Sequence, residues 1–106
     1  MPGFNEIRYA LTFLIHERFP EESTVADLVG DLEHFGVVVA GRPSKVVSDA
    51  LRREVSAGRL RRTGRGRYAA GVLPGGTKAR VRDRGRHFLH SPHHERTQEV
   101  PPRSVA

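Results

Sequence analysis

The chain has 106 residues, of which 37% are apolar and 28% charged, and it contains no cysteine. This length suits one small domain with tails, and the lack of cysteine excludes disulfides, a thiolate nucleophile and cysteine-ligated zinc. No apolar run approaches the roughly 18 residues of a membrane-spanning helix, and the first residues lack a signal-peptide pattern. We therefore expect a cytoplasmic protein with no membrane partner, no cofactor and no small-molecule substrate.

Charge is distributed very unevenly along the chain. Residues 1–40 carry seven acids and two bases, whereas residues 41–106 carry sixteen bases and five acids. Sixteen of the eighteen basic residues are arginine, whose guanidinium group forms forked hydrogen bonds to phosphate. A polyanion would therefore bind the carboxyl-terminal part of this chain.

Apolar residues at helical spacing predict a first helix from an N-cap at Asn5 to about Arg18. Phe4 and Tyr9 flank its start in the positions of a hydrophobic staple. The residues that repeat at helical spacing include leucine and isoleucine, so this helix is expected to turn one face to the core.

A second helix is predicted from its N-cap Thr24 to Gly36, with Asp27 in the position that completes a capping box. The stretch 37–41 that follows is short, β-branched and bounded by glycine. It fits either a brief strand or an apolar connection lying across the core, and we favour the connection.

A third helix is predicted from Pro43, which suits a first helical turn, to Gly58, which ends the apolar repeat. The opposite face of this helix carries small and basic side chains. Two short strand candidates then follow, Arg59–Thr63 and Arg67–Val72, on either side of a glycine-bounded turn. This arrangement is typical of a β-hairpin.

The remaining residues form a basic stretch and a polar tail. Thr77 is the expected cap of a possible fourth helix, although Gly85 interrupts its pattern and a mobile basic arm is the alternative. The proline-rich, polar residues that follow are expected to be disordered. The predicted organisation is a domain over residues 1–73, a basic extension over 74–90 and a disordered tail over 91–106.

Two stretches carry a resemblance to a known family. Residues 42–53 read Arg-Pro-Ser-Lys-Val-Val-Ser-Asp-Ala-Leu-Arg-Arg, and residues 64–68 read Gly-Arg-Gly-Arg-Tyr. Together with the order of elements, they make residues 4–72 resemble the winged helix-turn-helix DNA-binding proteins, apart from a connection between helices two and three that is longer than in the simplest units. The resemblance implies a mainly α fold with three helices and a two-stranded wing.

The resemblance also implies that the third helix enters the major groove and the wing approaches the minor groove. Lys45 or Arg52 would then read guanine, and Asp49 would accept from cytosine or repel misplaced phosphate. Arg65, next to the flexible Gly66, would insert into the minor groove. The alternative to DNA contact is that this polar face of the third helix is simply exposed to solvent. The candidate DNA-binding residues are Arg42, Ser44, Lys45, Ser48, Asp49, Arg52, Arg53, Arg61, Arg65, Gly66, Arg67, Lys78 and Arg80.

The expected function is double-stranded DNA binding, as a transcriptional regulator or a nucleoid-associated protein. The alternative is an interaction module that forms a homodimer or binds a partner through apolar residues of the first helix, Phe13 and Phe19, and binds polyanions only incidentally.

No pattern indicates an enzyme or a metal centre. Gly64-x-Gly66-x-x-Ala69 mimics a dinucleotide fingerprint, but it lies between two strands and does not open a helix. A histidine cluster near the carboxyl terminus has some chelating potential, yet no acid or cysteine completes a defined geometry. Its members are His87, His90, His93 and His94.

Overall fold

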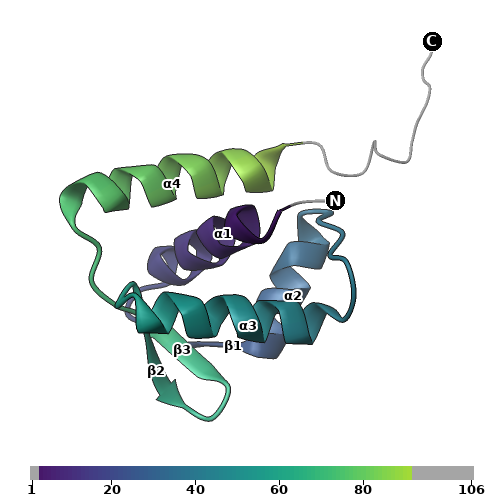
Figure 1. Cartoon of the computed structure of the whole chain (residues 1–106), viewed down its shortest axis with the longest axis horizontal. Coiled ribbons are helices and arrows are strands. Elements are labelled where there is room, and N and C mark those ends of the chain that lie inside the picture. Colours follow the sequence, from purple (N-terminus) through teal and green to yellow (C-terminus); the bar gives the residue numbers. More distant parts are fainter. Residues whose placement is uncertain (1–2, 92–106) are drawn as a thin grey trace.

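The computed structural model describes residues 3–91, which form four helices and a three-stranded antiparallel sheet (Figure 1). The mainly helical class is thereby confirmed. Within these residues no helix combines the length and apolar character needed to cross a bilayer. Residues 92–106, most of the tail expected to be disordered, lie outside the described part. The elements are α1 (Phe4–Glu17), β1 (Ser23–Thr24), α2 (Val25–His34), α3 (Pro43–Ser56), β2 (Leu60–Gly64), β3 (Arg67–Ala70) and α4 (Gly75–His90).

The start of α2 follows the predicted capping box. The Thr24 hydroxyl accepts from the Asp27 backbone amide at 3.0 Å, and the Asp27 carboxylate accepts from the Thr24 amide at 3.0 Å. The hydrogen bond that the Thr24 amide donates to the Asp27 carboxylate is the main reason that the pKa of Asp27 lies below its ordinary value. Together, the two hydrogen bonds of the capping box satisfy backbone donors that the first helical turn would otherwise leave without partners.

The start of α1 differs from the prediction. Its N-cap is Gly3, whose amide donates to the Glu6 carboxylate at 2.9 Å. Asn5 therefore lies inside the first turn, where its side chain accepts from Arg8 at 3.1 Å. The predicted hydrophobic staple required Asn5 as the N-cap. That prediction is wrong, because Phe4 is already the first helical residue.

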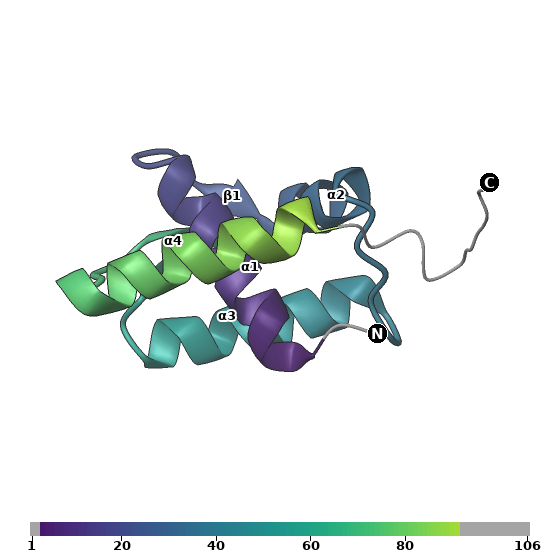
Figure 2. The same ribbon diagram turned by 90° about the horizontal axis from the view of Figure 1, so that it is seen from above.

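Helix α1 is the centre of the molecule. It lies between α4 on one side and α3 on the other (Figures 1 and 2). Its fully buried Leu11 and Ile15 pack in one apolar core with Leu28 of α2 and Leu51 of α3. Tyr68 of β3 also belongs to this core and is 5% exposed.

The sheet has one strand more than expected. The two-residue strand β1 pairs antiparallel with β3, placing Ser23 opposite Tyr68 and Thr24 opposite Arg67. The first amide of α2, that of Val25, donates to the Gly66 carbonyl at 3.3 Å. The hairpin is therefore attached to the start of α2. The predicted two-stranded hairpin is present as β2 and β3, and β1 is a third strand that the sequence does not predict. The stretch 37–41 is a connection, as favoured.

Residues 75–90 are helical and packed, so the alternative of a mobile arm is wrong. The helix begins at Gly75, with Pro74 and not Thr77 at the N-cap. Val81 and Leu89 of α4 are buried, and Gly85 faces α1. Helix α4 thus shares the core of the preceding residues, and Gly85 is where it comes close to α1.

Candidate nucleic-acid interface

Helix α3 has one buried and one uncovered face. Val47, Ala50 and Leu51 are fully buried against the core. A helix of 14 residues is about 21 Å long at 1.5 Å per residue. Its length and its uncovered polar face suit contact with a large partner. The side chains on that face are Ser44, Lys45, Ser48, Asp49, Arg52 and Arg53.

The two bases expected to read guanine share one carboxylate. Lys45 Nζ lies 2.9 Å from Asp49 Oδ2, and Arg52 Nη2 contacts Asp49 Oδ1. The hydrogen bond from Lys45 is the main reason that the pKa of Asp49 lies below its ordinary value. Both bases are well exposed, so they can exchange Asp49 for a phosphate or a base edge. An anionic partner would have to compete with the Asp49 carboxylate for them.

The hairpin presents four exposed arginines. Arg61 donates to the Ala70 carbonyl at 3.0 Å, and Arg62 donates to the Gly64 carbonyl at 3.2 Å. Arg67 lies 3.8 Å from the exposed Glu22 carboxylate. Arg65, at the two-residue turn between β2 and β3, forms no hydrogen bond or ion pair with any residue in 3–91. Of the four hairpin arginines, it is the one whose side chain has no such partner.

The turn itself brings backbone close to the surface. Gly66 follows Arg65 and has a φ of +68°, a conformation that residues with a Cβ rarely adopt.

The hairpin follows the end of α3 and lies beside it (Figure 1). Within residues 42–67, eight bases are exposed, and Asp49 is the one acid that is not buried. The eight are Arg42, Lys45, Arg52, Arg53, Arg61, Arg62, Arg65 and Arg67.

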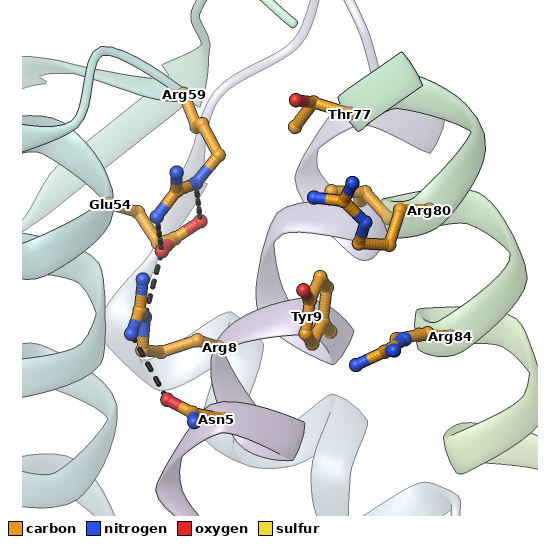
Figure 3. Close-up of a pocket in the computed structure, with 9 residues that line it drawn as sticks. Asn5, Arg8, Tyr9, Glu54, Arg59, Thr77, Arg80 and Arg84 are labelled. Atoms are coloured by element: carbon orange, nitrogen blue, oxygen red, sulfur yellow. Dashed lines mark hydrogen bonds and ion pairs between the residues drawn. The ribbon is translucent and has the colours of Figure 1, made fainter.

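Two of the candidate residues lie elsewhere. Lys78 and Arg80 belong to α4, which lies across α1 from α3 (Figures 1 and 2). The structure thus does not bring them together with the uncovered face of α3. Arg80 instead points into a pocket beside α1 (Figure 3).

The first-helix residues proposed for partner binding divide into two kinds. Phe13 is half-buried and lies against Gly85 of α4, so much of its apolar surface is already covered. Phe19, just after α1, is 69% exposed.

The histidine cluster is only partly within the described residues. His90 makes an edge-on ring contact with Phe35 at 5.5 Å, and no group of three potential metal ligands converges within residues 3–91. His93 and His94 lie outside the described part of the chain.

Glu54 was missed by the sequence reasoning. Its side chain is buried, and its carboxylate accepts from the Thr12 hydroxyl. It also accepts from Arg8 at 2.9 Å and from two nitrogens of Arg59 at 2.8 Å (Figure 3). Burial would raise the pKa of Glu54, but the hydrogen bonds from Arg59, Thr12 and Arg8 outweigh it and hold the pKa below its ordinary value. A signal was present, because Glu54 continues the apolar repeat set by Val47.

A scan against family models finds no match for this chain, and searches of the curated proteins and of the solved structures also find none. The charge and geometry of its own side chains are therefore what point to a function.

Proposed function

We propose that this chain binds double-stranded DNA as a winged helix-turn-helix protein, with α3 in the major groove and the tip of the hairpin at the minor groove. The observation that carries the proposal is the set of eight exposed bases on α3 and the adjacent hairpin. A helix is about 10–12 Å across with its side chains, which matches a major groove about 12 Å wide.

Phosphate contacts would supply most of the affinity. Each phosphate neutralised by a basic side chain releases counterions, so about six contacts give a slope near −5 when log affinity is plotted against log salt. The start of α3 adds to this attraction. Its N-cap, Arg42, makes no side-chain hydrogen bond to the helix. Pro43 has no amide hydrogen and the Lys45 amide donates to the Arg42 carbonyl, so within the described residues the Ser44 amide is the donor of this turn that remains for an anion.

Base reading would come from a smaller set of side chains. Lys45 and Arg52 are long enough to reach guanine from α3 once they leave Asp49. Arg65 is drawn to a narrow minor groove, where the negative potential is enhanced. Gly66 beside it lets the backbone approach the sugar-phosphate walls.

Fluorescence anisotropy tests the proposal directly. Labelled AT-rich, GC-rich and random duplexes are titrated between about 50 and 300 mM salt, the range over which counterion release changes affinity most. A single-stranded RNA of equal length is the control. We expect duplex binding with a steep salt dependence. A preference among duplexes at the highest salt indicates a regulator, and equal binding indicates a nucleoid-associated protein. Equal binding of RNA and duplexes, or none, would contradict the proposal.

Self-association is a second candidate, favoured by one observation. Phe19, just after the end of α1, is a large apolar side chain that is 69% exposed. Sedimentation velocity on the wild type and on Phe19→Asp tests it. A dimer that becomes a monomer in the variant supports an interface there, and two monomers exclude it.

A further inference from the structure

A pocket of about 260 Å³ lies where the first half of α4 faces α1 and the end of α3 (Figure 3). It is smaller than the roughly 300–1,000 Å³ of sites for drug-sized ligands. Four of its lining residues are arginines and one is acidic. The sequence does not reveal it, because its walls come from segments about 70 residues apart. The arginines are Arg8, Arg59, Arg80 and Arg84.

The single acid neutralises only part of this charge. Glu54 binds Arg8 and Arg59, and both of its oxygens are occupied by these partners and Thr12. One carboxylate thus faces two guanidinium groups, and Nη1 of Arg59 keeps no hydrogen bond within residues 3–91. Two guanidinium groups with one carboxylate leave a net charge of +1 on this side of the pocket.

The α4 side of the pocket has no acid at all. The Arg84 guanidinium lies 5.4 Å from the centre of the Tyr9 ring, which holds it in place without neutralising it. Arg80 makes no hydrogen bond or ion pair with any residue in 3–91 and points into the pocket (Figure 3). The pocket walls therefore carry three positive charges more than negative ones.

The beginning of α4 adds to this positive potential. Thr77, which lines the pocket, is the third residue of the helix, and the N-cap Pro74 makes no side-chain hydrogen bond to the first turn. The first amides of a helix and its dipole favour an anion at that end. Arginine binds phosphate oxygens through two parallel hydrogen bonds, and several arginines line this pocket together.

We propose that this pocket binds a small molecule carrying a phosphate group, with Arg80 and Arg84 as its main donors and Arg59 on the opposite wall. The site is separate from the uncovered face of α3, so it goes beyond the proposed DNA binding. Glu54 acts in positioning, because it orients the Arg59 and Arg8 side chains rather than contacting the ligand.

Calorimetric titration with inorganic phosphate and with pyrophosphate, without DNA, tests the proposal. We expect saturable binding of one pyrophosphate per chain, weakened about tenfold or more in Arg80→Gln/Arg84→Gln, since hydrogen bonds to charged groups are strong. Arg82→Gln/Arg86→Gln is the matched control, because it removes the same charge from exposed positions on the same helix. Arg80→Gln alone is the second test variant, since Arg80 has no partner whose loss would disturb folding.

Equal weakening in the two double variants would overturn the proposal, because it would show attraction to a generally basic surface. Absence of saturable binding for both probes would also overturn it. A third arm measures duplex affinity in the same variants. If only duplex binding falls in Arg80→Gln/Arg84→Gln, the pocket holds a phosphate of the DNA backbone, and the small-molecule site is rejected.

Discussion

Gly85 of α4 and Phe13 of α1 meet so closely that a Cβ on Gly85 would lie 2.5 Å from the Phe13 Cβ. The same Cβ would lie 2.8 Å from the Tyr9 carbonyl oxygen. Neither neighbour is the movable end of a side chain, so neither can turn aside. This contact sets how closely α4 approaches α1, and with it the width of the arginine-lined pocket.

Gly85→Ala is therefore expected to destabilise the protein, although alanine is the better helix former. Overpacking at a tight contact costs about 1–3 kcal/mol, more than the roughly 1 kcal/mol gained in helix propensity. Thermal unfolding followed by circular dichroism measures the effect. Gly30→Ala is the matched control: Gly30 lies in α2 with nothing within 4 Å of an added Cβ, so it should gain about 0.5–1 kcal/mol. A Gly85→Ala protein as stable as this control would show that the contact is not tight.

Glu54→Gln is expected to cost about 2–4 kcal/mol in unfolding free energy, because it leaves Arg8 and Arg59 without their buried charged partner. The expected loss in unfolding free energy lies towards the low end of this range, because the side chains of both arginines are 25% exposed and water screens their charge. Urea unfolding at neutral pH measures it. Glu33→Gln, at an exposed position of α2, is the control and should change little. An equal loss in both variants would contradict a special role for Glu54.

Glu54 also predicts acid sensitivity. Its pKa is lowered in the folded protein from an ordinary value of 4.5, so the folded state favours the ionised carboxylate. Its stabilisation is complete above pH 4.5 and is lost as the pH falls through the lower, folded-state pKa. Melting temperatures measured at several pH values should fall less steeply in Glu54→Gln than in the wild type below that point. Parallel curves would contradict this linkage.

Asp49→Asn is expected to increase duplex affinity several-fold, since it frees Lys45 and Arg52 and removes a charge that repels phosphate. Anisotropy titrations at fixed salt measure the change. Asp83→Asn is the control, because Asp83 is an exposed acid of α4, across α1 from α3. If Asp49 instead accepts from a cytosine, the variant loses affinity for the preferred duplex alone.

Arg52→Ala/Arg65→Ala is expected to weaken duplex binding strongly and to reduce the salt slope by about 2, one for each lost phosphate contact. Arg82→Ala/Arg86→Ala removes the same charge from α4 and should leave the slope nearly unchanged. The measurement is the affinity across the salt series. Unchanged affinity in the first variant would remove both α3 and the hairpin from the interface.

Local signals were enough to predict much of this chain. The capping box at Thr24, the helix opened by Pro43 and the glycine-bounded turn at Gly66 each depend on residues adjacent in sequence. Arginine enrichment after residue 41 likewise predicts a basic surface from composition alone. Such features do not depend on what the segment packs against, so they can be predicted before the fold is known.

Tertiary contacts decided the rest. The strand at Ser23 exists only because it pairs with Tyr68, and a two-residue strand has no pattern of its own. Gly85 interrupts a helical pattern when read alone, and in the folded chain it is where α4 meets α1. The pocket around Arg80 joins residues separated by most of the chain. Side-chain periodicity reports which face of an element is buried, but the partner of that face is set by packing between distant segments, so only the tertiary structure could identify it.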